Sequence, residues 1–147
     1  MLSAMALATY YVVANRNLAP AVLAGAADRQ PQASLAGIDP TRLANLFVIL
    51  ARYRRPYGGP ARCKLLTDAT LDQCVLLVPP RMVALLATAE PFVQQVAAEW
   101  ASAPRGALGH CSPQAAAEAL VTLIELAKTA RRMDTDLLLW LSLARNP

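Results

Sequence analysis

Apolar residues recur at helical spacing in several parts of this chain. In one segment they stand at positions i, i+3, i+4 and i+7, namely Leu43, Leu46, Phe47 and Leu50. This spacing places all four side chains on one face of a helix. We expect the helix to start at Asp39-Pro40, because Asp is a favoured N-cap and Pro fits the first helical position. We expect it to end near Arg55, because Pro56 disfavours helical backbone in the preceding residue.

Four further segments carry helix signals. Helices are expected over residues 17–27, from Pro80 onwards, from Pro91 to about Pro104, and from Pro113 to about Arg132. The last of these is capped by Ser112 and turns four apolar side chains inward: Leu120, Leu123, Ile124 and Ala127. Residues 28–38 are expected to form a loop, and residues 61–72 have room for one short helix.

Three segments lack helical spacing and are expected to form strands: residues 7–14, 74–78 and 137–143. The first is rich in aromatic and β-branched side chains, and the second is a short apolar run stopped by Pro79-Pro80. Residues 137–143 are apolar on both faces, which predicts a central strand covered on both sides. A final helix is the alternative for this segment.

These elements predict an α+β fold that is mostly helical, with about five helices around a short three-stranded sheet. A chain of 147 residues without internal repeats or a Gly/Ser linker is expected to form a single globular domain, residues 1–147. Trp100 and Trp140 both lie on apolar faces, so both are expected in the core.

Composition raises the question of a membrane, because hydrophobic residues make up 56% of the chain and charged residues only 16%. The longest apolar stretch covers residues 1–15, which is shorter than a spanning helix and lacks the basic n-region of a signal peptide. We therefore expect no membrane association and a cytoplasmic protein. Its three cysteines are an odd number without a secretory signal, which favours free thiols in a reducing compartment.

Chemistry-bearing residues are few and poorly spaced. Cys63, Cys74, His110 and Cys111 make a possible zinc set by count, but structural zinc sites pair their ligands across two to four residues. Asp68 and Asp72 would share a helix face, where a solvated surface is the simpler interpretation. Phosphate-binding and nucleophile-elbow motifs are missing from the sequence. We expect no metal, no cofactor, no catalytic residues and no enzymatic activity; the roles of the three cysteines and of the histidine stay open.

Positive charge gathers in the first half of the chain. Residues 1–67 hold eight cations and two anions, and no acidic residue stands between Asp39 and Asp68. The densest part is the Arg-rich patch within residues 52–64, whose candidate binding residues are Arg52, Tyr53, Arg54, Arg55, Tyr57 and Arg62. Arg and Tyr dominate protein-binding hot spots, and Arg also binds nucleic-acid phosphates. The patch therefore predicts a protein partner with an acidic face, with nucleic acid as the alternative and a solvated helix end as the simplest case.

The layout of the chain resembles one kind of protein. Five stretches of the chain carry the resemblance. They are the strand followed by a helix around Tyr10-Tyr11, the helix start at Ile38-Asp39-Pro40 with Leu43 and Leu46, the passage from Val78-Pro79-Pro80 into Val83 and Leu85-Leu86, the helix end at Trp100-Ala101, and the final segment Leu139-Trp140-Leu141-Ser142-Leu143. This layout resembles small uncharacterised bacterial proteins that look like immunity partners of polymorphic, interbacterial toxins. The resemblance implies a non-enzymatic protein that neutralises a cognate antibacterial toxin by occluding its active site. The alternative is a nucleic-acid-associated accessory or regulatory protein that uses the patch at 52–64.

Overall fold

A computed structural model describes residues 5–24, 30–35, 37–53, 62–67, 73–102 and 112–145. Its described strands form one antiparallel sheet in the order β2-β1-β5-β4-β3. The strands are β1 (Met5–Val13), β2 (Gln32–Ser34), β3 (Lys64–Leu65), β4 (Gln73–Leu77) and β5 (Leu137–Arg145). The two long strands β1 and β5 pair along their whole length and form the middle of the sheet.

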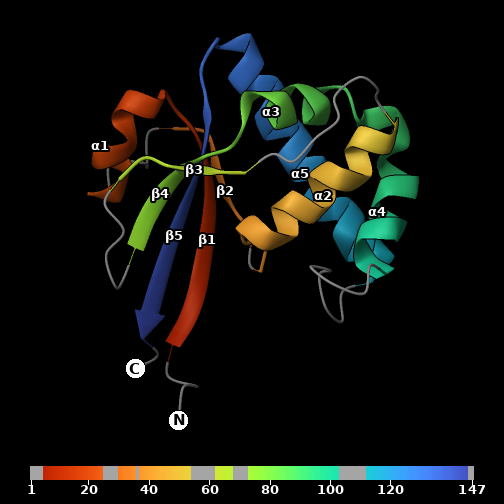
Figure 1. The fold of residues 1–147 in the computed structure, drawn as a ribbon, viewed down its shortest axis with the longest axis horizontal. Helices are drawn as coiled ribbons and strands as arrows, with labels where there is room; N and C mark the ends of the chain where they lie inside the picture. The colour runs from red at the N-terminus through yellow and green to blue at the C-terminus, as the bar shows by residue number, and fades with distance from the viewer. Residues whose placement is uncertain are drawn as a thin grey trace.

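Helices cover the sheet unequally. Four helices gather on one side, namely α2 (Pro40–Tyr53), α3 (Pro80–Ala87), α4 (Val93–Ser102) and α5 (Pro113–Arg132). The 3₁₀ turn η4 (Glu90–Phe92) leads into α4, and the 3₁₀ turn η2 (Arg16–Leu18) leads into the short helix α1 (Ala19–Leu23). Figure 1 shows α1 alone on the opposite side of the sheet, beside only one end of the strands. The fold is therefore a thick helical layer, a sheet and a small cover.

Two hydrophobic clusters follow from this arrangement, because successive strand residues point to opposite faces. Tyr11, Val13, Leu137 and Leu139 belong to the large cluster between the sheet and α2–α5. Val12, Val75 and Leu138 belong to a smaller cluster under α1. β5 is thus buried on both faces near its start, which confirms the central, doubly covered strand and rules out the final helix.

Long elements follow the sequence pattern closely. The Asp39 carboxylate accepts the backbone N–H of Arg42 at 2.9 Å, and the Ser112 hydroxyl oxygen accepts that of Ala115 at 3.1 Å. Both predicted N-caps therefore hold their helices, α2 and α5. The apolar stripe of α2 is buried as expected, and so are the four inward residues of α5.

The expected three-stranded sheet is wrong, because the sheet has five strands. β2 lies inside the segment that we expected to be a loop, and β3 lies where a short helix was allowed. Both are edge strands of three and two residues, too short to show any alternation of apolar and polar positions. β2 forms a strand because it pairs with β1, and β3 because it pairs with β4. Tertiary contacts therefore determine these two strands, not their local sequence.

Two smaller expectations need correction. The helix predicted over residues 17–27 begins as η2, and α1 ends at Leu23. Trp100 is fully buried, but Trp140 is only partly buried, at the border of the smaller cluster. Within the described part of the chain, no helix has both the length and the apolar character that crossing a bilayer requires.

Candidate interaction surface

The Arg-rich patch is only partly placed by the structure. Arg52 and Tyr53 form the end of α2, and Arg62 is exposed just before β3. Arg54, Arg55 and Tyr57 lie outside the described residues. The structure therefore brings Arg52 and Tyr53 together, and it leaves the expected cluster of six untested.

Arg52 and Tyr53 both bind one carboxylate, that of Glu99 on α4. The Arg52 guanidinium contacts Oε2 of Glu99 at 3.2 Å, and the Tyr53 hydroxyl donates to Oε1 at 2.7 Å. The hydrogen bond to the carboxylate raises the pKa of the Tyr53 hydroxyl above its ordinary value, because it stabilises the protonated form. The Tyr53 ring also lies 5.4 Å from the ring of Phe92.

These contacts orient Arg52 without burying it. Its side chain is 63% exposed and that of Glu99 is 38% exposed, so their ion pair adds only about 0–1 kcal/mol to stability. A guanidinium has five N–H donors, and the structure shows one of its nitrogens on Glu99. Arg52 is therefore a cation held in place at the surface, and a partner carboxylate can approach its outer side.

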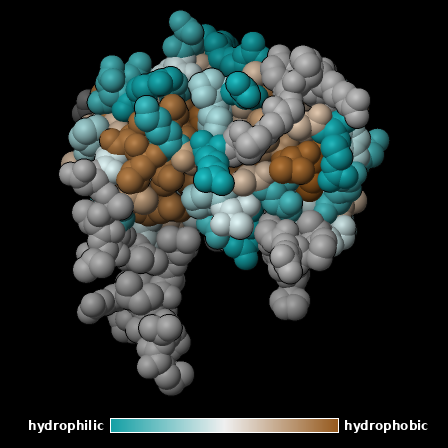
Figure 2. All heavy atoms as spheres, in the orientation of Figure 1, coloured by the Kyte–Doolittle hydropathy of each residue, from teal (hydrophilic) through white to brown (hydrophobic). Residues whose placement is uncertain are grey.

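One exposed apolar side chain stands beside Arg52. Val48 is 56% exposed and precedes Arg52 by four residues, so the two lie next to each other on the outer face of α2. Figure 2 shows hydrophobic surface over α2 with hydrophilic side chains around it. We call Val48, Arg52 and Tyr53, together with Glu99, the α2 surface. The sequence analysis missed Val48, although its position off the apolar stripe of α2 was a usable signal.

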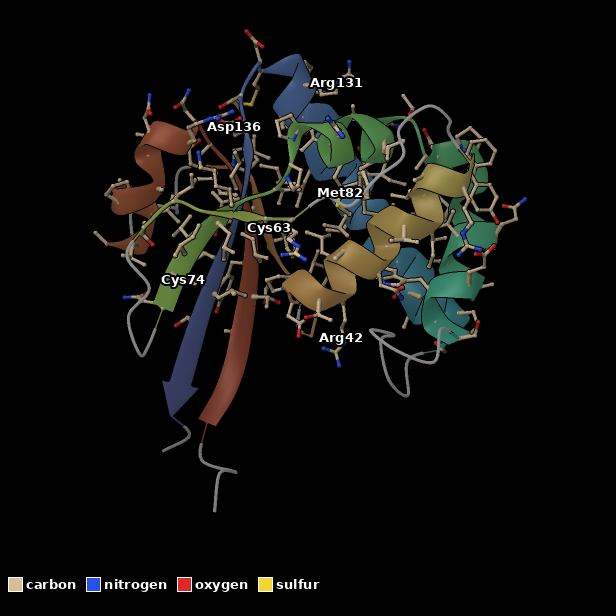
Figure 3. All side chains as sticks on the ribbon, in the orientation of Figure 1. Arg42, Cys63, Cys74, Met82, Arg131 and Asp136 are labelled. Atoms are coloured by element: carbon tan, nitrogen blue, oxygen red, sulfur yellow. The ribbon has the colours of Figure 1, made fainter. Side chains whose placement is uncertain are left out.

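The described cysteines do not assemble a reactive or metal-binding site. Cys63 lies next to the Leu77 end of β4, whereas Cys74 lies three residues nearer its start, about 10 Å along the strand (Figure 3). Cys111, His110, Asp68 and Asp72 lie outside the described residues. Among the residues that are described, no three His, Cys, Asp or Glu side chains come close enough to hold a metal ion.

Cys63 and Tyr11 are weak acids kept in a poorly solvated place. Cys63 packs against the large cluster, and burial raises the pKa of its thiol to about 11. Tyr11 is fully buried and donates its hydroxyl to the Ile38 carbonyl at 2.7 Å. Burial, followed by the nearby Cys63 and Asp39, raises the pKa of Tyr11. Both groups therefore oppose ionisation in the folded state.

The Cys63 thiol predicts a specific loss of stability at alkaline pH. The unfolded chain ionises this thiol from about pH 9, while the folded chain holds the proton until about pH 11, so rising pH favours unfolding. Two pKa units correspond to about 2–3 kcal/mol. We expect wild type to lose that much more unfolding free energy between pH 8 and pH 11 than Cys63→Ala, measured by urea denaturation. Equal losses in the two proteins would show that the thiol is not shielded.

A shallow hollow opens between α3, the end of α5 and the start of β5. Its volume is about 380 Å³, with Val78, Val83 and Leu137 among its lining residues and the charged side chains Arg131 and Asp136 beside them. Figure 3 places Arg131 and Asp136 at this end of the molecule. Asp136 is already engaged, because both its oxygens accept hydrogen bonds from the Arg16 guanidinium at 3.2 Å. The lining mixes apolar residues with Arg131, Asp134 and Thr135, and its Asp136 carboxylate already has a partner, so the hollow is a weaker candidate than the α2 surface.

Comparisons of the chain with protein-family models, with curated proteins and with solved structures find no match.

Proposed function

We propose that this protein is a non-enzymatic binding protein that neutralises a cognate antibacterial toxin by covering its active site. The observation that carries the proposal is the pairing of exposed Val48 with the oriented cation of Arg52 on α2. Arg and Tyr are enriched in binding hot spots, and the exposed Val48 adds apolar area beside them. The layout of the chain, which resembles immunity proteins, supplies the toxin as the class of partner.

The electrostatics of the α2 surface favour an acidic partner. Arg52 keeps most of its guanidinium exposed, and Arg62 is exposed before β3. The chain as a whole carries a net charge of +4. Complementary charge steers association and fixes the orientation of the complex, while the buried apolar contact slows its dissociation. A toxin that cleaves a polyanion such as a nucleic acid has a basic active site, which the cationic α2 surface would not match. We therefore expect a toxin that has an acidic surface beside its active site, or one whose substrate is not a polyanion.

The α2 surface predicts a partner-binding defect in Val48→Asp. A carboxylate at this position would be desolvated in the interface, and it would draw the Arg52 guanidinium away from a partner anion. We expect affinity for the partner to fall about thirtyfold, or about 2 kcal/mol, with little change in melting temperature. Val121→Asp is the matched control, because Val121 is a 45% exposed valine on α5, away from the α2 surface.

Two steps test this function. Tagged wild type, Val48→Asp and Val121→Asp are used to capture partners after nuclease treatment, and the captured protein is then purified for affinity measurements. Its gene is expressed in a bacterium alone and together with each variant. We expect the partner to stop growth, and wild type and Val121→Asp to restore it, but not Val48→Asp. A harmless partner would reject the toxin, and equal binding by both aspartate variants would reject the α2 surface.

A further inference from the structure

A second surface lies on the other side of the molecule, on the sheet face that α1 shares. Residues directly opposite each other in an antiparallel pair point to the same face. Tyr10 stands opposite Trp140 in the β1–β5 register, and Gln73 stands opposite Ser142 in the β4–β5 register. Trp140 and Ser142 are two residues apart, so all four belong to one face. Val12 and Leu138 belong to this face as well, which makes it the face that α1 covers at one end.

Among the described residues, α1 is the one helix on this face, and it covers only one end of it. It packs on β4 and β5 through the small cluster, and Val12, Val75 and Leu138 beneath it are fully buried. Figure 1 shows the strands running on well past α1. Tyr10 and Trp140 border the small cluster, and they and Gln73 are only partly buried. We call these three residues the aromatic platform.

Contacts within the aromatic platform hold its two rings in place. The ring centres of Tyr10 and Trp140 are 5.2 Å apart, with 37° between the ring planes. The Trp140 indole N–H donates to Oε1 of Gln73 at 3.1 Å. The next residues along the same face are Ala8 and Ser142, both small. Two rigid aromatic rings on adjacent central strands therefore lie beside small neighbours, which leaves room for a flat group to approach them.

Charge on this side of the molecule is one-sided. β1 to β5, η2 and α1 contain no acidic residue, whereas β3 carries the exposed Lys64. Arg16 of η2 is already paired with Asp136. The register places Lys64 opposite Leu77, which is on the face of the aromatic platform. The described acidic residues belong to α4, α5 and η4, to the residue before α2, or to the turn that enters β5. A polyanion meets no described carboxylate on the strands beside the two rings.

We propose that the aromatic platform binds single-stranded nucleic acid, with bases stacking on Tyr10 and Trp140. Flat bases match two adjacent rings, and RNA-binding sheets use aromatic side chains on neighbouring strands in this way. A phosphate backbone matches the exposed cation of Lys64 and the lack of acidic residues on the described strands. A double helix keeps its bases stacked inside and offers them to no ring, so the platform selects single strands. This binding is independent of the α2 surface, which lies in the helical layer.

The experiment is a titration of fluorescein-labelled oligo(U) and oligo(dT) with the whole protein, followed by anisotropy at low and at physiological ionic strength. We expect Tyr10→Leu to weaken binding about tenfold, because one base loses its stacking partner. Tyr10→Phe keeps the ring and is expected to bind like wild type. Phe92→Leu is the matched control, because Phe92 is also a partly buried aromatic residue in a tilted ring pair but lies in η4.

A second readout needs no variant. Trp140 is partly exposed and Trp100 is fully buried, so we expect oligo(U) to quench the indole emission that iodide also quenches. Equal affinity of the protein for duplex and for single strands would overturn the proposal, and so would unchanged oligonucleotide binding by Tyr10→Leu. Loss of oligonucleotide binding in Arg62→Glu but not in Tyr10→Leu would overturn it as well. If wild type bound no oligonucleotide and Tyr10→Leu lost capture of a protein partner, the aromatic platform would be a protein-binding surface. That result would also overturn the nucleic-acid proposal. The α2 surface is tested separately through Val48→Asp, so failure of one proposal leaves the other standing.

Discussion

Trp100→Ala is expected to cost the protein about 3–5 kcal/mol of unfolding free energy. Trp100 is fully buried on α4 and is the largest of the buried side chains. Its removal leaves a cavity between helices that hold the main cluster together, and the surrounding backbone can collapse into it only in part. The indole N–H also donates to the Arg42 carbonyl at 3.1 Å, which ties α4 to the first turn of α2. The loss is a large share of the 5–15 kcal/mol typical of a domain.

Trp100→Phe separates packing from hydrogen bonding. Phenylalanine keeps much of the buried volume but cannot donate to the Arg42 carbonyl, so we expect a loss of about 1–2 kcal/mol. Urea denaturation followed by circular dichroism at 222 nm measures both variants, and Trp140 emission reports on the sheet in the same samples. If Trp100→Ala lost less than about 1 kcal/mol, α4 would not be packed against α2 as the structure shows. Such a result would also undermine the α2 surface, because Glu99 on α4 orients Arg52.

Sequence periodicity identified the long elements because each one is stabilised by its own residues. α2 and α5 have an N-cap, a proline at the first position and an apolar stripe, and all three signals agree. β1 and β5 are nine residues long and strongly apolar. Composition favoured strands for both, but a final helix stayed open for residues 137–143 until the pairing of β5 with β1 and β4 excluded it. The same reasoning failed for β2 and β3. Their few residues carry no pattern, and only the partners β1 and β4 make them strands.

The candidate surfaces could be predicted less completely than the fold. Arg52 and Tyr53 were identified by residue type, but their shared partner Glu99 lies 46 residues from Tyr53, and no local pattern reports that contact. Val48 had a signal in its position off the apolar stripe. Trp140 also had one, since Ser142 on the same face of β5 indicated that this face is not wholly covered. Each of these signals is a single residue in an otherwise apolar segment. The surrounding apolar pattern favours burial, and so the exposure of Val48 and of Trp140 was not predicted.

The two surfaces lie on different layers and have different physical characters. The α2 surface combines an apolar side chain with a cation that is held by a carboxylate, which suits a protein partner. The aromatic platform has two partly exposed rings and no acidic strand residue, which suits stacked bases. Because the sheet separates the two surfaces, a ligand on one does not sterically exclude a ligand on the other. Substitutions at either surface should therefore change one binding activity at a time.

Leu138→Ala is expected to destabilise the protein by about 2–5 kcal/mol, although Leu138 lies in the smaller cluster. Leu138 is fully buried on the central strand β5, between the sheet and α1. Truncation opens a cavity under a five-residue helix, which has too few hydrogen bonds to stay folded without that packing. Ser142→Ala, on the same face of the same strand, is the control and should change stability by less than about 0.5 kcal/mol. Urea denaturation compares the two. A loss below about 1 kcal/mol for Leu138→Ala would mean that α1 is not a packed layer, and the open area around the aromatic platform would then extend over the whole face.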